Sequence, residues 1–338
     1  MKTSQPDTER LPYGINELKP KVVPLNGKPR RVRCYVKNCQ QVLKTPTRAE
    51  KGDVCPDHGI RCHYSSAGAT YAYADPAWNI IASAREFKQQ IIGHPFKYES
   101  HRLGLERSED TLSWNVFRSL QEAGALAQFA NKITKEECRI EPFLYLWGIC
   151  ISNNEFEPWD LLIAARRRFE ANLPVDRPQT EPDIALHLPG RYLILIEAKF
   201  TSPNTFYKRG PRKDRSSLTF EELLNIYQDK KLKCLNMRQA ASGFRIPYQL
   251  WRNMIFAEWM AAADHPHTKA YHVNLVREGY EEKTALEFSG LMSDKFQDRF
   301  QQTTWEQVYR MVQDEPRLVR LRRYLQTKTA GLKQAFRV

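Results

Sequence analysis

The residues best suited to chemistry lie on a predicted β-hairpin near the middle of the chain. Asp183 opens its first strand, Pro189 and Gly190 provide the turn, and Tyr192–Phe200 forms an apolar second strand. Four consecutive branched aliphatic residues, Leu-Ile-Leu-Ile at 193–196, leave that second strand without a polar face. The sequence therefore predicts a strand that is buried on both sides.

The second strand ends in two opposite charges one residue apart. Because side chains alternate along a strand, Glu197 and Lys199 point to the same side. Burying a lone charge is expensive, so an acid and a base at the end of an apolar strand need a reason. A divalent metal supplies one, because Asp183 and Glu197 would bind the ion while Lys199 faces the substrate.

Together these residues resemble the PD-(D/E)xK nuclease superfamily, which has the restriction-endonuclease-like fold. The pattern is Pro182-Asp183, thirteen residues, and Glu197-Ala198-Lys199. The resemblance implies an α/β fold with a central mixed β-sheet flanked by helices. It also implies a site for Mg²⁺ (or Mn²⁺) at Asp183, Glu197 and the Ala198 carbonyl. Lys199 would orient or deprotonate the attacking water, or stabilise the developing charge. The alternative, a surface hairpin with an incidental Glu–Lys pair, is disfavoured by the apolar run before the pair.

The superfamily often takes a further acid from its first core helix. A helix is predicted to begin at Ser108, and the candidate acids are Glu106, Glu109 and Asp110. Glu109 lies three residues before Leu112 of the apolar stripe, so it faces inward and is the acid we expect at the metal. The alternative is that Glu109 only favours the helix N-terminus, which Ser108 caps.

Nucleases of this superfamily also carry a polar residue, often Gln or Lys, on the helix that follows the Glu-x-Lys strand. A helix is predicted over 244–263, and Gln249 fits this role as a catalytic-site residue. Arg252 and Asn253 are one helical turn further and could face the same cleft. An ordinary solvated position explains Arg252 equally well.

Four of the seven cysteines crowd into one short N-terminal segment. Two ligand pairs separated by a loop are the usual arrangement of a small zinc site, and a reducing compartment favours metal over disulfides. This Zn²⁺ is expected to be structural, because the segment has little apolar surface with which to fold unaided. The alternative is a group of unligated cysteines. The preferred ligands are Cys34, Cys39, Cys55 and His58, and Cys62 or His63 could replace His58.

Composition narrows the class of protein. The chain has 338 residues, of which 41% are hydrophobic and 27% charged, as in a globular protein. Its net charge of +13 indicates a polyanionic partner, most simply nucleic acid. No stretch has the length of a membrane-spanning helix, and the N-terminus has no apolar signal segment, so we expect a cytoplasmic protein.

A basic loop over 201–217 follows Lys199 and is placed to grip DNA phosphates near the scissile bond. The cations expected to bind nucleic acid there are Lys208, Arg209, Arg212, Lys213 and Arg215.

Four segments are expected along the chain. Residues 1–30 form an irregular basic arm, 31–75 a zinc-binding module, 76–285 the nuclease core and 286–338 a helical basic C-terminal extension. Further helices are expected over 76–92, 158–168 and 219–231 and a strand over 270–277, whereas the apolar run 139–152 fits strand or helix.

These features favour a metal-dependent DNA endonuclease that acts in phage defence, restriction or a mobile element. The chain has no nucleotide-binding P-loop and no methyltransferase motif, so such activities would come from companion proteins of a multi-component system. A homo-oligomer is also expected, because many double-strand cutters of this fold dimerise. The alternatives are a non-catalytic nucleic-acid-binding or assembly protein on a nuclease scaffold, or an RNA-directed nuclease.

Overall fold

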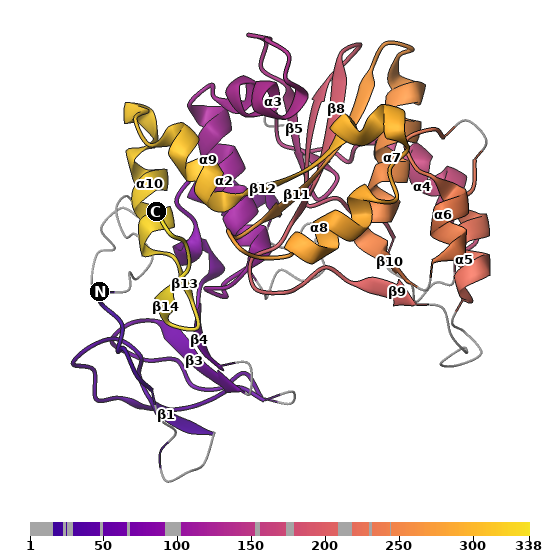
Figure 1. Cartoon of the computed structure of the whole chain (residues 1–338). Coiled ribbons are helices and arrows are strands. Elements are labelled where there is room, and N and C mark those ends of the chain that lie inside the picture. Colours follow the sequence, from indigo (N-terminus) through magenta and orange to yellow (C-terminus); the bar gives the residue numbers. More distant parts are fainter. Residues whose placement is uncertain are drawn as a thin grey trace. The chain divides into compact units, whose positions relative to one another are not determined.

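Figure 1 shows the computed structural model of the chain, which divides into two compact units. The first unit comprises Met1–Ser119 and Val308–Val338, and the second comprises Leu120–Gln307. Among the described residues, no helix combines the length and apolarity needed to cross a lipid bilayer. The structure describes residues 16–22, 25, 30–47, 50–65, 68–91, 103–152, 156–173, 179–208, 218–229, 232–243 and 245–338.

The second unit is built around a six-stranded mixed β-sheet with the strand order β12-β11-β8-β7-β5-β6. β8 and β12 run parallel to β11, whereas the other neighbours pair antiparallel. The expected α/β architecture with a central mixed sheet is therefore confirmed. The strands are β5 (Phe143–Leu146), β6 (Ile149–Cys150), β7 (Ile184–Leu188), β8 (Tyr192–Ala198), β11 (Lys269–Val276) and β12 (Phe300–Thr304).

The predicted hairpin forms the centre of this sheet as β7 and β8. Every residue of both strands is buried, as the apolar run at 193–196 predicts. The backbone N–H of Arg191 donates to the Leu188 carbonyl at 3.0 Å and closes the turn. Gly190 has a φ of +71°, a left-handed conformation that glycine adopts without strain. The prediction of a buried hairpin is confirmed.

Helices cover the faces of the sheet in the second unit (Figure 1). α7 packs against β8 and β11, α4 packs against α7, and α3 contacts β11. The core between α7 and the sheet includes Leu193, Leu195 and Trp251. The helices are α3 (Leu126–Thr134), α4 (Asp160–Glu170), α5 (Phe220–Ile226), α6 (Met237–Ser242), α7 (Tyr248–Asp264), α8 (Glu282–Ser289) and the 3₁₀ helix η6 (Asp294–Arg299). The unit also contains a short antiparallel pair of strands, β9 (Phe206–Lys208) and β10 (Arg245–Pro247).

The sheet contains one strand that the sequence did not predict. β12 reads Phe-Gln-Gln-Thr-Thr, which lacks an apolar alternation, yet it pairs with β11 over its whole length. β12 lies beyond residue 285, where we expected the nuclease core to end. The ambiguous run 139–152 folds as the strands β5 and β6.

The first unit combines small antiparallel sheets with helices from both ends of the chain. A second, smaller hydrophobic core surrounds the N-terminal cysteines and includes Leu332. The strands are β1 (Arg31–Arg33), β2 (Val42–Lys44), β3 (Ile60–Ser65), β4 (Gly68–Tyr73), β13 (Thr329–Ala330) and β14 (Lys333–Gln334). The helices are η2 (Pro76–Asn79), α1 (Ala84–Glu86), η3 (Phe87–Ile91), η7 (Pro316–Leu318) and α10 (Val319–Thr327). The boundaries between the two units fall within α2 (Glu109–Glu122) and α9 (Trp305–Val312).

The helix expected over 76–92 is instead broken into η2, α1 and the π-helix η3. The expected cap is present, because the Asp75 carboxylate accepts from the Ala77 N–H at 3.0 Å. Asn79 is fully buried, and its side-chain amide donates to backbone carbonyls near Leu103 instead of facing solvent. Ser83 then adopts a left-handed φ of +43°, which interrupts the helix.

Candidate active site and candidate metal centre

The hairpin register brings the two predicted metal-binding acids opposite each other. Ile184 pairs with Ile196, so extending this register by one residue sets Asp183 opposite Glu197. Directly opposed residues on antiparallel strands have Cβ atoms roughly 4.5–5.5 Å apart and project to the same face. One carboxylate oxygen of Asp183, Oδ2, accepts a hydrogen bond from the Ala198 N–H at 2.7 Å, which holds Asp183 at the end of β8.

Glu197 is surrounded by donors from its own strand and from α7. Lys199 Nζ lies 2.6 Å from Glu197 Oε1, and the two side chains are 8% and 4% exposed. Gln249 Nε2 donates to Oε1 at 2.5 Å, and Asn253 Nδ2 donates to Oε2 at 2.7 Å. The structure therefore brings together Glu197, Lys199 and Gln249 from the predicted set, with Asp183 on the neighbouring strand.

The hydrogen bonds to the Glu197 carboxylate leave few of its lone pairs available to a metal cation. A carboxylate has about four lone-pair sites, two on each oxygen. Among the described residues, Oε1 accepts from Lys199 and Gln249, whereas Oε2 accepts from Asn253 alone. A cation could therefore approach Oε2 without displacing any bond, but would have to displace Lys199 or Gln249 to reach Oε1.

Gln249 is held in one orientation by contacts at both ends of its amide. Its oxygen accepts from the N–H and the hydroxyl of Thr205, each at 3.1 Å, so its nitrogen faces Glu197. Arg252 is placed differently from its neighbours on α7. Its Nη1 lies 3.9 Å from Oε1 of the buried Glu170 and its side chain is 11% exposed, so it is not an ordinary solvated residue.

Sequence reasoning missed two asparagines near this position. Asn274 on β11 is the register partner of Glu197 and is fully buried. Its side-chain oxygen accepts from Asn204 at 3.0 Å, and its nitrogen donates to Gln302 on β12 at 2.9 Å. The signal in the sequence is an asparagine inside an otherwise apolar strand, which is expensive unless its amide is hydrogen-bonded. Their place beside the candidate site depends on sheet pairing, which the sequence did not predict.

The candidate acids around the start of α2 belong to the first unit and differ in their contacts. Glu106 pairs with Lys328 Nζ at 3.3 Å, and both side chains are buried, so Glu106 already has a counter-charge. Glu109 is the first residue of α2 and is half-buried. Ser108 caps that helix, because its hydroxyl accepts from the Thr111 N–H at 3.2 Å. Metal binding by Glu109 stays a prediction.

Among the five cations predicted in the basic loop, the first lies within the described residues. Lys208 is the last residue of β9 and is exposed. The other four, Arg209, Arg212, Lys213 and Arg215, lie outside the described residues.

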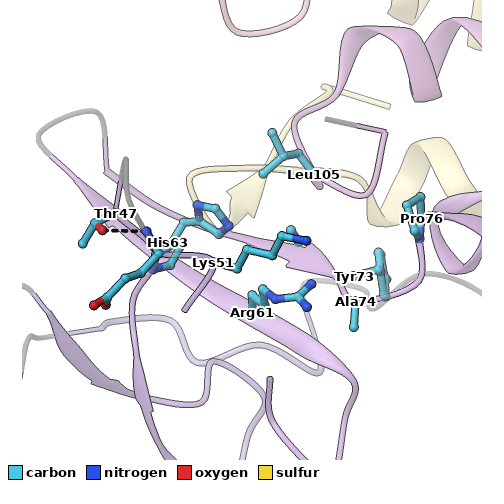
Figure 2. A pocket seen from close by; sticks show the side chains of 11 residues that line it. Thr47, Lys51, Arg61, His63, Tyr73, Ala74, Pro76 and Leu105 are labelled. Carbon is cyan, nitrogen blue, oxygen red and sulfur yellow. Dashed lines mark hydrogen bonds between the residues drawn. The ribbon is translucent and has the colours of Figure 1, made fainter. Parts of the chain in front are cut away.

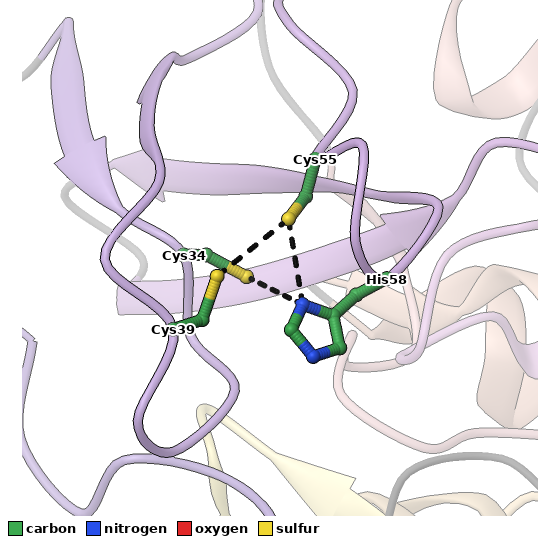
Figure 3. Close-up of side chains that lie close together, drawn as sticks. All are labelled: Cys34, Cys39, Cys55 and His58. Carbon is green, nitrogen blue, oxygen red and sulfur yellow. Dashed lines mark hydrogen bonds between the residues drawn. The ribbon is translucent and has the colours of Figure 1, made fainter.

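In the first unit, three cysteines and one histidine converge (Figure 3). The ligand atoms of Cys34, Cys39, Cys55 and His58 all lie within 4.8 Å of one another. The Sγ atoms of Cys39 and Cys55 are 3.8 Å apart, and His58 Nδ1 lies 3.4 Å from Cys55 Sγ and 3.8 Å from Cys34 Sγ. Tetrahedral Zn²⁺, with Zn–S about 2.3 Å and Zn–N about 2.0 Å, needs ligand atoms roughly 3.5–3.8 Å apart. The cluster therefore has the donors and the spacing to bind a metal such as zinc.

The backbone around this cluster is fixed by a lysine and a tight turn. Lys19 Nζ donates to the carbonyl oxygens of Cys34 and Cys39 at 2.6 and 2.7 Å. Gly59 has a φ of +63°, and a Cβ placed there would meet the Trp78 ring at 2.2 Å. Glycine is required at that position both by its conformation and by the close approach of the ring.

The fourth member of the cluster is His58, as in the preferred ligand set. Among the residues described, the set of four with metal-ligand spacing includes His58 and omits Cys62 and His63. Burial raises the pKa of Cys39 to about 12, and it raises the pKa of Cys55 as well. Without a cation these thiols stay protonated, so a metal would supply the charge that stabilises the thiolates.

The chain matches one known family. A family model described as restriction endonuclease associating with ARP matches residues 155–328, slightly more than half of the chain. The chain belongs to this family and is restriction-endonuclease-like. The matched residues include Asp183, Glu197 and Lys199 but not the cysteine cluster or Glu109. No curated protein and no solved structure matches the chain.

Proposed function

We propose that the chain is a metal-dependent DNA endonuclease whose active site is the Asp183–Glu197–Lys199 group of the second unit. The observation that carries the proposal is the register that sets Asp183 opposite Glu197, with the Lys199 amine 2.6 Å from the Glu197 carboxylate. The family match supports a nuclease of this kind.

Asp183 and Glu197 are the residues that hold Mg²⁺ or Mn²⁺ in this proposal. Both offer carboxylate oxygen, which hard divalent cations prefer. A bound divalent ion supplies charge neutralisation on the phosphate and a more acidic water. Gln249 and Asn253 hold the Glu197 carboxylate in place.

Lys199 is the residue that acts on the water or the phosphate. Its ammonium group is now paired with Glu197, and cation binding to that carboxylate weakens this pairing by competition. The amine then faces the phosphate, where it orients the attacking water or stabilises the developing negative charge. Lys208 and the rest of the basic loop neutralise neighbouring phosphates.

The cysteine cluster holds a structural Zn²⁺ in this proposal and takes no part in cleavage. It is a closed set of three thiols and one imidazole, with no carboxylate among its four ligands. Catalytic zinc sites usually have three protein ligands and an open position for water, whereas structural sites have four.

The family description also indicates a partner. Because the family is described by its association with ARP, we propose that this chain works with such a companion protein in the cytoplasm. A phage-defence, restriction or mobile-element system fits that arrangement, and a homo-oligomer would let two active sites cut two strands.

One observation favours the alternative of a non-catalytic nucleic-acid-binding protein. Glu197 and Lys199 are only 3% and 6% exposed, and three donors from the protein already occupy the carboxylate. A site neutralised in this way is stable without an ion, as expected of a scaffold that has lost activity.

Cleavage of supercoiled plasmid tests the proposal. We expect nicked or linear products with Mg²⁺ or Mn²⁺ and none without a divalent ion. Asp183→Asn and Glu197→Gln should each reduce the rate by at least about a thousandfold while leaving the protein folded. Glu282→Gln, an exposed acid in the first turn of α8, is the matched control and should cut like the wild type. Cleavage by both acid variants at the wild-type rate would refute the assignment. A parallel assay on RNA separates the RNA-directed nuclease.

A further inference from the structure

A cavity in the first unit lies on the opposite side of the β3–β4 hairpin from the cysteine-containing core. Its volume is about 550 Å³, and the hairpin, the segment before Gly52 and the residues around Tyr73–Pro76 line it (Figure 2). Ligand pockets in proteins typically measure roughly 300–1,000 Å³, so there is room for a ligand much larger than a phosphate ion.

The alternation of side chains along the hairpin gives its two faces different roles. Ile60 and Cys62 on β3 are fully buried in the core that holds the metal cluster. Arg61 and His63 alternate with them and line the cavity instead. Ala72, the register partner of Arg61 on β4, also lines the cavity, and its small side chain leaves the space open.

Two cationic side chains, Arg61 and Lys51, line the cavity. Within the described part of the chain, the buried Nε of Arg61 has no hydrogen-bond partner. In Figure 2, Lys51 extends into the same space as Arg61. Glu50, the acid of the lining, lies 2.5 Å from Lys44 and so already has a counter-ion. Burying part of a guanidinium without a partner is unfavourable, so the cavity is suited to an anion.

His63 also lines the cavity, and its pKa is lowered there. Burial first, and then the positive charges of Arg107 and Arg61, lowers the pKa of His63 to about 4. The imidazole is therefore neutral near pH 7, with one nitrogen that donates and one that accepts. Such a group can hydrogen-bond the edge of a heterocycle beside the cationic end of the cavity.

The apolar part of the lining comes from Pro46, Pro76 and Leu105. Tyr73 borders the cavity, but it pairs with Ile60 and is buried in the cysteine-containing core, so its ring belongs to the other face of the hairpin. Proline rings and a leucine side chain offer an apolar surface against which the face of a nucleobase can pack.

We propose that this cavity binds one nucleotide, with its phosphate at Arg61 and Lys51 and its base against Pro46, Pro76 and Leu105. A nucleotide combines an anion, a flat heterocycle and a suitable size in one ligand. The proposal concerns a site in the first unit and does not depend on cleavage by the second.

Binding to the full zinc-loaded chain, without added Mg²⁺, tests the proposal separately from cleavage. The probes are 5′-dAMP, a fluorescent single-stranded DNA 12-mer and inorganic phosphate. The variants are Arg61→Gln and Lys51→Gln, and the charge-matched control is Lys37→Gln, an exposed lysine outside the cavity lining. We expect each cavity variant to weaken nucleotide binding about tenfold, and the control to match the wild type.

The two sources of a nucleotide give different patterns. If the nucleotide belongs to a strand, both cavity variants weaken DNA binding and lower the salt dependence by roughly one phosphate contact. If the ligand is a free nucleotide, only 5′-dAMP binding weakens. Both patterns support the proposal. Unchanged binding of both probes overturns it, and so does phosphate competing as well as 5′-dAMP, because the base would then contribute nothing.

Two checks distinguish weaker nucleotide binding from a folding defect in the variants. Arg61 is half-buried, so its variant is checked by zinc content and thermal unfolding. Lys51 is exposed, and its substitution removes no core contact. Loss of binding in Lys51→Gln with unchanged zinc content therefore reports the cavity itself.

Discussion

The cysteine cluster and the Glu197 site differ in what balances their negative charge. In the cluster, the sulfurs lie 3.4–3.8 Å from one another or from the imidazole nitrogen, and the Asp57 carboxylate lies 3.7 Å from the Cys39 sulfur. At Glu197, the protein supplies its own cation, because the Lys199 amine lies 2.6 Å away. The first arrangement needs an external cation to ionise its thiols, whereas the second is neutral as it stands.

In the function proposed above, this difference separates a structural ion from an exchangeable one. A cluster of protonated thiols would gain stability when a metal binds, so its ion would be part of the fold. A carboxylate that is already paired can lose and regain a metal without unfolding. The four predictions that follow test this contrast, beginning with the largest effect.

Removing one cluster ligand should unfold the first unit. Cys55→Ala leaves three ligands, and structural Zn²⁺ contributes on the order of 10 kcal/mol to the folding of small zinc domains. We expect metal analysis to show loss of the zinc, and limited proteolysis to cut within the N-terminal segment.

Two nearby residues provide the controls for this experiment. Cys62→Ala and His63→Ala lie outside the cluster of four and should keep the ion, whereas His58→Ala should lose it. Retention of zinc by His58→Ala together with its loss from Cys62→Ala would contradict the ligand set.

Removing the amine from the Glu197 site should have a smaller effect that a metal can reverse. Lys199→Met leaves Glu197 buried without its counter-charge, which typically costs about 3–5 kcal/mol. We expect urea unfolding without divalent ions to show this loss. Mg²⁺ should stabilise Lys199→Met more than the wild type, because the carboxylate has become free to bind it.

The double variant sharpens this result. Glu197→Gln combined with Lys199→Met removes both charges, so its stability should return toward that of the wild type. An equal response of the single variant and the wild type to Mg²⁺ would show that Glu197 does not bind the ion.

Burial of His272 in the central sheet predicts that the free energy of unfolding depends on pH. Burial lowers the pKa of His272 to about 4, below its ordinary value of 6.5. The unfolded chain therefore binds more protons between those values, so stability present above pH 6.5 is lost as the pH falls toward 4. The loss attributable to this residue is at most about 3 kcal/mol at pH 4.

The measurement compares unfolding free energies of His272→Leu and the wild type from pH 7 to pH 4. The variant lacks the titrating imidazole, so its stability should fall less over this range. His267→Asn, an exposed histidine, should follow the wild type at every pH. A parallel fall in all three proteins would show that His272 is protonated without cost.

The smallest effect is expected at Gln249. Gln249→Ala removes the bond to Glu197 and the two bonds from Thr205 to the Gln249 side chain, at a cost of about 1 kcal/mol in stability. We expect the cleavage rate to fall about tenfold, because Asn253 and Lys199 still hold the carboxylate. Gln228→Ala, at an exposed position, is the control. A loss as complete as that of Glu197→Gln would give Gln249 a direct role in chemistry.

The central hairpin and the cysteine cluster could both be predicted from the sequence. The apolar run at 193–196 and the turn at Pro189 and Gly190 are local signals, and together they set the register that opposes Asp183 to Glu197. The cysteine spacing is also local, since short loops bring Cys34 to Cys39 and Cys55 to His58.

Other elements could not be read from local patterns. β12 is polar and is held as a strand by its parallel pairing with β11, a contact between separate parts of the chain. The segment expected as one helix over 76–92 breaks because buried Asn79 bonds the backbone near Leu103. Tertiary contacts outweighed helix propensity there.

The sequence by itself determined the hairpin, the acids at its open end and the set of converging cysteines, because each depends on residues close along the chain. Only the tertiary structure decided which side chains surround Glu197. Gln249 and Asn253 reach it from α7, and Asn274 lies beside it on β11. Helix packing and strand order bring these distant residues together through the burial of apolar surface, which carries no local signature.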